Sequence, residues 1–331
     1  MSVFSWRTPF PGTSFDAAGL VALADLNTIA HRTALIGTAT FIDALVLCPG
    51  IHRQQKASDL NQGELPPTAA LTSGYVFRIE NQATVAYLQG VGKTGQLVTV
   101  TVENLRKGYW YHFWALLFGP SISVLSSVLI VVAILSTITS IILLATFRDW
   151  WAVGILLTLI VARFLNIFLI RRRTRPSWHG ALEPGATGDL LILLSQDRWI
   201  RVQGSVDALK VVTSGRWLNE MTFFESSLEA TATLLVYVSA ALASNATQSG
   251  KILLAALLLV SVGLLGISNK QEKAFYMHGH ILSTKGRPRA YARRLDLAKE
   301  LIKETKRHDW AIGLGMVKAE DYGEQSVSVT L

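Results

Sequence analysis

Cysteine is almost missing from the chain, and its scarcity excludes two kinds of stabilising site. Among the 331 residues there is one cysteine, Cys48. A single thiol cannot form an intramolecular disulfide, and it leaves no cysteine cluster for a structural zinc ion. Residues 1–12 also lack an apolar core and a run of arginines, so we expect neither a cleavable signal peptide nor a transit peptide.

The signatures of common enzymes are missing as well. The sequence has no Gly-x-Ser-x-Gly motif, which would mark a hydrolase nucleophile. The stretch Gly90-Val-Gly-Lys-Thr94 matches the end of a phosphate-binding loop, but Tyr87 stands where that pattern requires glycine. A strand is predicted over 97–102, where the pattern requires a helix. We therefore interpret the stretch as a hairpin turn.

Metal ligands are scarce too. His278 and His280 are two candidate imidazoles, with His308 and Asp309 as distant additions, but a metal site needs three or four suitably spaced ligands. We interpret the two histidines as exposed residues of a strand. We accordingly expect no catalytic residue, no cofactor and no bound metal, and a non-enzymatic function is favoured.

What the sequence does contain is long apolar runs. The first extends from Phe113 to Phe147 and the second from Ala152 to Ile170. A hydrocarbon core about 30 Å thick takes about 20 apolar residues in a helix. Residues 121–147 supply that length without a charge, and the second run carries only Arg163. Both runs are predicted to span a membrane, as a hairpin over 111–170.

A second pair of apolar runs, 228–246 and 252–267, is separated by only five residues. It predicts a second tight hairpin over 228–268. The predicted fold class is therefore an α-helical polytopic membrane protein, with four spans as two tight hairpins and mixed α+β cytoplasmic parts.

Three regions outside the hairpins have mixed patterns. The N-terminal region, 1–110, holds β-rich runs at 75–79, 84–88 and 97–102, which predict a small antiparallel sheet. Within it, Thr33–Cys48 is too short to span a membrane and is interpreted as a buried or interfacial element.

The insert, 171–227, has strand patterns at 190–194 and 199–202, and its stretch 205–214 fits either a short capped helix or a strand. The basic tail, 269–331, has a strand pattern at 274–277 and an amphipathic helix from about Arg289 to Arg307. Neither region is large enough to bury much core alone, so we expect both to pack together, along with the N-terminal sheet.

Charge predicts the orientation. The chain has 31 lysines and arginines against 23 acidic residues, a net charge of +8. The run Arg171–Arg175, Lys270 and Lys273 flank the hairpins on one side, whereas the two turns hold Arg148 and Lys251. Because basic residues stay in the cytoplasm, both termini and the insert are predicted to be cytoplasmic.

Two sets of residues are candidate sites. Arg163 and Asn166 lie within a predicted span, where an ionisable group is costly. They form either a polar pathway or a binding site for an anionic ligand, or a structural contact with serines and threonines of the first span. The structural contact is favoured. The second set is a group of basic residues that would contact an anionic lipid surface or simply be solvated. Its members are Arg287, Arg289, Arg293, Arg294, Lys299 and Lys303.

The chain from the first hairpin onward resembles an uncharacterised family of fungal multi-pass membrane proteins. The resemblance rests on the strings at 188–199, 212–217, 294–302 and 309–316. It implies a fungal membrane protein and says nothing about activity.

The sequence therefore predicts an integral membrane protein that acts as an adaptor, a regulator or a structural component. The alternative is a small oligomeric transporter or channel that uses Arg163. The expected partners are the lipid bilayer, anionic lipid headgroups, and either a second copy of the chain or an unknown protein; no nucleic acid is expected.

Overall fold

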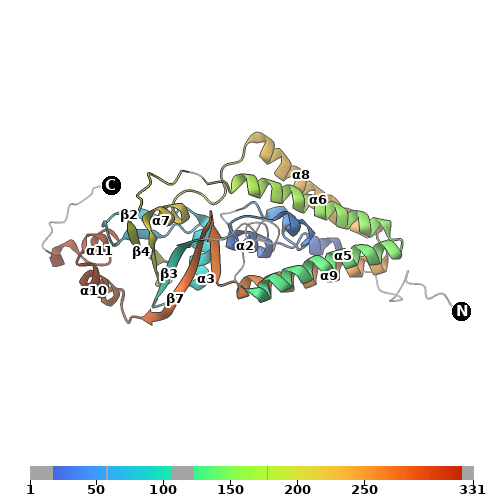
Figure 1. Ribbon diagram of the computed structural model, residues 1–331. Coiled ribbons are helices and arrows are strands. Elements are labelled where there is room, and N and C mark those ends of the chain that lie inside the picture. Colours follow the sequence, from blue (N-terminus) through green and yellow to red (C-terminus); the bar gives the residue numbers. More distant parts are fainter. Residues whose placement is uncertain (1–17, 57–58, 106–122, 177, 323–331) are drawn as a thin grey trace. The chain divides into compact units, whose positions relative to one another are not determined.

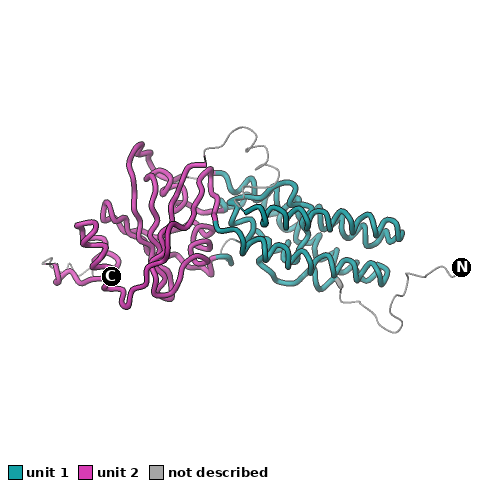
Figure 2. Tube along the Cα trace, turned by 60° about the horizontal axis from the view of Figure 1, so that its bottom comes forward, with its two compact units in different colours: residues 1–60, 107–175, 218–273 teal, residues 61–106, 176–217, 274–331 magenta. Residues whose placement is uncertain are grey.

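The computed structural model describes residues 18–56, 59–105, 123–176 and 178–322. The chain divides into two compact units, each assembled from three stretches of sequence (Figure 2). Unit 1 comprises 1–60, 107–175 and 218–273, and unit 2 comprises 61–106, 176–217 and 274–331. The predicted N-terminal region, 1–110, is thus shared between both units.

Unit 1 is built on four long apolar helices (Figure 1). They are α5 (Val124–Thr146), α6 (Trp150–Arg173), α8 (Phe223–Leu242) and α9 (Gln248–Gln271). Each begins after a residue whose side-chain oxygen accepts a hydrogen bond from the first helical turn, which satisfies an otherwise free backbone N–H. These capping residues are Ser123, Asp149, Thr222 and Thr247.

All four helices are long and apolar enough to cross a membrane. A helix of 24 residues, such as α6 or α9, is about 36 Å long at 1.5 Å per residue. The predicted third run begins later than the helix does, because Thr222 and Glu225 form a capping box that starts α8 at Phe223. Residues 113–122 of the predicted first run lie outside the described residues.

The N-terminal part of unit 1 packs among these helices as short elements. They are α1 (Ala18–Ala22), α2 (Thr28–Leu35) and the 3-10 helices η1 (Phe41–Leu45) and η2 (Ile51–Arg53). Elsewhere in unit 1, the 3-10 helix η4 (Ala243–Asn245) follows α8. Helix α5 packs along α9 and α6 along α8, with α1 and α2 against α9 and η1 against α6. Most residues of Thr33–Cys48 are buried, which confirms the buried-element interpretation.

Unit 2 contains one seven-stranded mixed sheet. Its strands are β1 (Pro67–Ala70), β2 (Val76–Arg78), β3 (Gln96–Asn104), β4 (Thr187–Leu194), β5 (Arg198–Ser205), β6 (Ala274–Met277) and β7 (His280–Ala290). The spatial order is β2-β1-β4-β5-β3-β7-β6, with β3 parallel to β5 and the other pairs antiparallel. The separate antiparallel sheet predicted before the first helix is therefore wrong, whereas the expected packing of insert, tail and N-terminal strands is confirmed.

Helices cover both faces of the sheet. The helices of unit 2 are α3 (Gln82–Val91), α7 (Val206–Thr213), α10 (Arg294–Thr305), α11 (Asp309–Gly313) and the 3-10 helix η5 (Ala319–Tyr322). Leu297 and Trp310, from α10 and α11, pack with Leu191 and Trp199 on one face. Because side chains alternate along a strand, Gly188 lies on the opposite face, where α7 packs beside it through Leu209.

Two predicted elements differ in the structure, and a third, left open between helix and strand, is decided by it. Residues 84–88, predicted as a strand from Thr84 and Val85, lie in helix α3, whose start is capped because the Asn81 side chain accepts from the Thr84 N–H over 3.1 Å. The tail helix begins at Arg294 rather than Arg289, because β7 continues to Ala290 in register with β3. Residues 205–214 adopt the helical alternative, with Ser205 as the N-cap of α7.

Candidate functional site

Helix α6 carries an arginine in the middle of its apolar sequence. Arg163 is only 2% exposed, and its guanidinium group has two neutral hydrogen-bond acceptors. Its Nη1 donates to the side-chain oxygen of Gln54, and its Nε donates over 3.4 Å to the backbone carbonyl of Asp43. The Asp43 carboxylate is close enough to attract the guanidinium group. Gln54 and Asp43, from the same N-terminal stretch, therefore supply both the hydrogen-bond acceptors and the negative charge that this buried guanidinium group needs.

Asn166 lies one turn further along α6 and is also buried. Its Nδ2 donates to the carbonyl oxygens of Ile51, over 3.3 Å, and Ala162, over 3.1 Å. Its Oδ1 accepts from Gln55 Nε2 over 3.1 Å, and the same Nε2 donates to the backbone carbonyl of Asn166 over 3.0 Å. Both polar atoms of the Asn166 side chain are thus paired within the protein.

The same face of α6 continues to Arg173. Its Nη1 donates to Gln55 Oε1 over 2.9 Å, and its Nε donates to the carbonyl of Asn219 over 2.8 Å. Positions 163, 166 and 173 fall on one face of a helix. We call Arg163, Asn166 and Arg173 the α6 polar face, and residues 38–55, which supply most of its partners, the N-terminal segment.

A second contact fastens the N-terminal segment at its other end. Arg171 Nη1 donates to the carbonyl of Ala39 over 3.0 Å, and its guanidinium carbon lies 4.6 Å from the centre of the Phe41 ring. The Phe41 ring in turn lies 6.0 Å from that of Phe164. Hydrogen bonds, a cation–π contact and an aromatic pair therefore hold the segment along α6.

Local sequence explains the shape of the N-terminal segment. The Thr40 N–H donates to the Asp43 carboxylate over 2.9 Å, which fixes the start of η1. Gly50 has a φ of 91°, and a Cβ there would lie 1.9 Å from the Leu26 carbonyl oxygen, so the turn requires glycine. Between them, Cys48 is buried, and burial raises the pKa of its thiol to about 12, although the Arg163 charge opposes that shift.

The expected partners of the α6 polar face were the wrong ones. Serines and threonines of the first apolar run were predicted to accept from Arg163, but Gln54 and Asp43 do so. In α5, the hydroxyls of Ser136, Thr137 and Ser140 donate to backbone carbonyls of α5 itself. Helical hydroxyls commonly donate to the carbonyl three or four residues earlier, as these three do.

Comparison with protein-family models, curated proteins and solved structures finds no match. The resemblance to fungal membrane proteins therefore stays a prediction.

The predicted lipid-contact residues lie on the end of β7 and on α10 in unit 2, and all six are exposed. Arg289 pairs with Glu300 at 2.6 Å and Arg294 with Asp197 at 2.5 Å. Within the described parts of the chain, the other four have no ion-pair partner; these are Arg287, Arg293, Lys299 and Lys303.

Helix α10 packs against the sheet through one apolar face. Leu297, Ala298 and Leu301 lie in the core with Ile302 partly buried beside them, whereas Leu295 is 38% exposed. The helix is held to the sheet by these side chains, so the basic residues lie on its solvent side.

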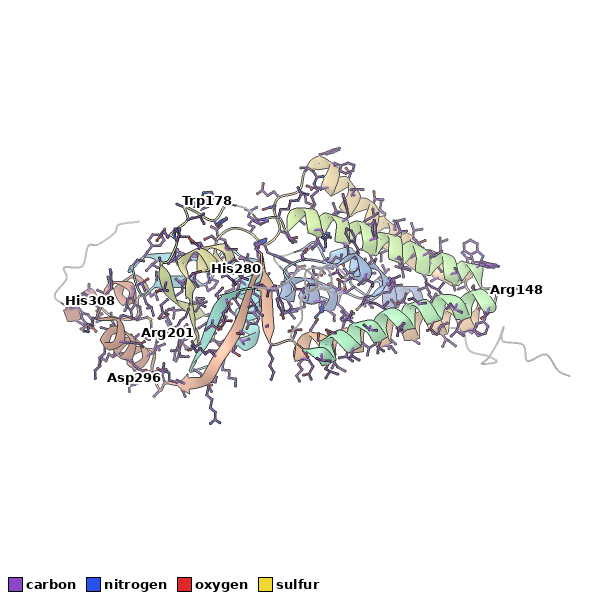
Figure 3. The ribbon with its side chains drawn as sticks, in the orientation of Figure 1. Arg148, Trp178, Arg201, His280, Asp296 and His308 are labelled. Atoms are coloured by element: carbon purple, nitrogen blue, oxygen red, sulfur yellow. The ribbon has the colours of Figure 1, made fainter. Side chains whose placement is uncertain are left out.

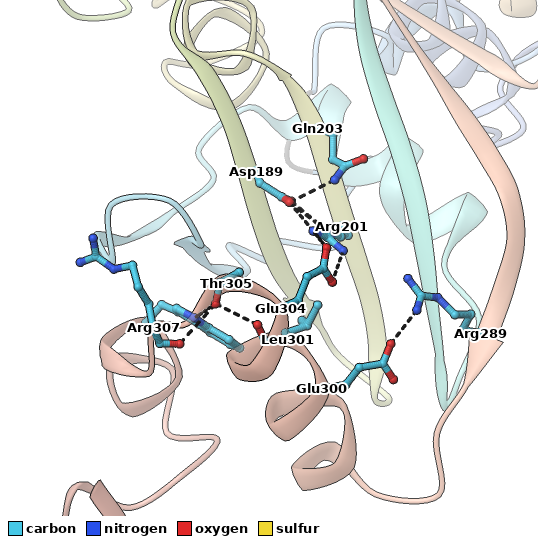
Figure 4. Close-up of polar contacts among 10 residues, drawn as sticks. Asp189, Arg201, Gln203, Arg289, Glu300, Leu301, Glu304, Thr305 and Arg307 are labelled. Atoms are coloured by element: carbon cyan, nitrogen blue, oxygen red, sulfur yellow. Dashed lines mark hydrogen bonds and ion pairs between the residues drawn. The ribbon is translucent and has the colours of Figure 1, made fainter. Parts of the chain in front are cut away.

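A polar cluster that was not predicted from the sequence surrounds Arg201 in β5. The Arg201 guanidinium is bonded by Asp189 of β4, at 2.5 to 3.0 Å, and by Glu304 of α10, at 2.7 and 2.9 Å (Figure 4). These bonds raise the pKa of Arg201 and lower the pKa of Glu304. The sequence feature that could have predicted this cluster is an arginine inside the strand pattern Trp199-Ile-Arg-Val202, because a charge buried in a strand requires partners.

His278 lies in the turn between β6 and β7, and His280 is the first residue of β7; both side chains are half-buried rather than exposed. His278 adopts a positive φ of 46°, and burial lowers the pKa of both imidazoles. His308 lies in the helical part of unit 2, far from His280 (Figure 3), and its ring stacks on Tyr322 at 4.7 Å. Within the described residues, no group of three or more His, Cys, Asp or Glu side chains is placed to hold a metal ion.

Gly90–Thr94 is not a hairpin turn. Gly90 and Val91 end helix α3, and the chain then turns into β3. The helix precedes the glycines and a strand follows them, which is the reverse of a phosphate-binding loop.

Proposed function

We propose that the chain is a multi-pass integral membrane protein that acts as an adaptor, a regulator or a structural component. In this proposal α5, α6, α8 and α9 cross the bilayer as two tight hairpins. Both termini and unit 2 are cytoplasmic, and unit 2 offers the surface that binds a protein partner or a second copy of the chain.

The exposed surface of the long helices supports membrane insertion. Val124 is 78% exposed, Phe223 90%, Leu234 63% and Leu259 61%. Water-soluble proteins seldom expose large contiguous apolar surfaces, whereas lipid covers them without cost. Trp150 and Trp151, exposed at the start of α6, suit the headgroup layer.

The positions of the charges support the orientation. Asp149 and Thr247 are hydrogen-bonded, so α6 and α9 begin at the same end of unit 1. Arg172 pairs with Glu225 at 2.6 Å, which places the end of α6 beside the start of α8. The basic run 171–175 and Lys270 then share the other end, and the positive-inside rule makes that end cytoplasmic.

The pairing of Arg163 with other groups of the chain is the observation that carries the proposal. Its hydrogen-bond partners are groups of the chain itself, and the N-terminal segment lies against the α6 polar face. A conducting pathway would keep such donors for water or a substrate. A structural arginine therefore favours an adaptor or scaffold over a transporter.

One observation favours the alternative of a small oligomeric transporter or channel. Within the described part of the chain, the buried Gln54 Nε2, next to the Arg163 contact, has no hydrogen-bond partner, and neither do the hydroxyls of Ser239 in α8 and Ser261 in α9. Unpaired polar atoms among apolar helices are costly, and a polar pathway would explain their presence.

Variants of neighbouring α6 residues distinguish the two functions. We expect Arg163→Leu to lower the abundance and the thermal stability of the purified protein, because it removes the anchor of the N-terminal segment. Phe168→Leu is the matched control, because Phe168 is 41% exposed on the same helix. Normal abundance of Arg163→Leu, together with loss of anion flux into proteoliposomes that the wild type supports, would establish the transporter instead.

Topology is tested separately with introduced cysteines. In a Cys48→Ser background, Ser195→Cys and Ser283→Cys in unit 2 should resist an impermeant thiol reagent in intact cells and react after permeabilisation. Labelling of either cysteine in intact cells would place unit 2 outside.

A further inference from the structure

Unit 1 contains another buried arginine, Arg32, whose guanidinium group has fewer hydrogen-bond partners than that of Arg163. Arg32 of α2 is 3% exposed. Its Nη1 donates over 3.2 Å to the hydroxyl of Ser126 in α5, and among the residues that the structure describes its buried Nε has no partner. A guanidinium group carries five N–H donors and cannot lose its charge in a protein. Most of the donors of Arg32 are therefore unused.

The surroundings of Arg32 are polar but hold no anion. The Ser126 hydroxyl also bonds the hydroxyl of Ser268, near the end of α9, over 2.7 Å. The adjacent Asn269 donates over 2.9 Å to the carbonyl of Thr28, one turn before Arg32, and its Oδ1 is buried without a partner. No described carboxylate forms an ion pair with Arg32.

Comparison with the other buried arginines of unit 1 shows how unusual this is. Arg163 has Gln54, the Asp43 carbonyl and the nearby Asp43 carboxylate. Arg173 has two hydrogen-bonded residues and is attracted by Glu225 and Glu229. An unpaired buried charge is strongly destabilising, so a folded protein that retains one generally pairs it with a bound counterion.

We propose that Arg32, with Ser126 and Ser268, forms a binding site for a phosphate group. The guanidinium group supplies free N–H donors in the planar arrangement that phosphate oxygens accept. Ser126 lies in the first turn of α5, where the helix dipole also favours an anion. The phosphate group is either part of a lipid headgroup or a free phosphate ion. Only a lipid ligand depends on the proposed membrane insertion; the site itself does not depend on it.

Binding to the full-length protein in uncharged detergent tests the site. The probes are dioctanoyl phosphatidic acid, inorganic phosphate and, as an uncharged lipid, dioctanoylglycerol, each titrated while the thermal unfolding midpoint is recorded. We expect phosphatidic acid to raise the midpoint and dioctanoylglycerol to leave it unchanged. An equal effect of inorganic phosphate would identify a free phosphate as the ligand.

Two matched variants assign the binding to Arg32. Arg32→Gln should weaken phosphate binding at least about tenfold, because it removes a charge-assisted contact. Lys270→Gln removes an exposed charge from the same end of α9 and should leave the affinity unchanged. If Arg32→Gln does not fold, Ser126→Ala keeps the charge but removes its anchor and should weaken binding several-fold. No binding by the wild type, an equal loss in Lys270→Gln, or unchanged affinity in Ser126→Ala would overturn the proposal.

Discussion

Asp149 joins the first turns of two long helices through one carboxylate. Its Oδ1 accepts from the Ala152 N–H of α6 over 3.1 Å. Its Oδ2 accepts from the N–H and the hydroxyl of Thr247, the N-cap of α9, over 2.9 and 2.7 Å. The carboxylate therefore satisfies donors at two helix starts, where it also interacts favourably with both helix dipoles.

Gly250 in α9 gives this junction a sensitive test. A Cβ at position 250 would lie 2.1 Å from Asp149 Oδ2, so we expect Gly250→Ala to push the carboxylate away and to destabilise unit 1 by about 1–3 kcal/mol. Gly263→Ala is the matched control in the same helix, because no atom lies within 4 Å of its Cβ. It should be neutral or stabilise by up to about 1 kcal/mol through helix propensity. Thermal unfolding in detergent measures both, and equal midpoints would contradict the junction.

The Arg201 cluster predicts a contrast between two ion pairs in unit 2. Arg201 is 6% exposed, so Arg201→Met should cost about 3 kcal/mol because it strands the Asp189 carboxylate. Arg289→Met breaks the exposed pair with Glu300, and should cost less than about 1 kcal/mol. Chemical denaturation followed by tryptophan fluorescence, to which the buried Trp199 and Trp310 of unit 2 contribute, measures both costs. Equal costs would show that the Arg201 cluster is not structurally important.

Cys48 predicts how stability depends on alkaline pH. Burial raises the pKa of its thiol from 9.0 to about 12, so the folded protein keeps a proton that the unfolded chain loses. Between those pH values the folded state binds more protons, and the free energy of unfolding falls as pH rises. In Cys48→Ala the free energy of unfolding should fall less steeply between pH 9 and 11 than in the wild type. Identical slopes in the two proteins would refute this effect.

The long helices could be predicted because about 20 apolar residues in sequence decide the structure locally. The partners of Arg163 could not, because Asp43 and Gln54 lie more than 100 positions earlier in the chain. Arg163 and Asn166 were recognised from their cost in an apolar helix, which is a property of the sequence alone. Which groups offset that cost is a property of the tertiary packing.

The sheet shows the same limit. The strands at 190–194 and 199–202 could be predicted from local patterns, but the parallel pairing of β3 with β5 brings together residues about 100 positions apart. Residues 84–88 were misassigned because β-branched Thr84 and Val85 favour strands, and the Asn81 cap was overlooked. Tertiary packing overrides such propensities.

A double-mutant cycle between Arg163 and Gln54 tests most directly whether the N-terminal segment is held on α6 by the α6 polar face. Unfolding free energies are measured in detergent for the wild type, Arg163→Leu, Gln54→Leu and the double variant. We predict a coupling energy of about 1.5–3 kcal/mol, as for a hydrogen bond to a charged group, because each single variant leaves a buried polar partner unpaired. Additive effects, with a coupling energy near zero, would contradict a structural role for Arg163.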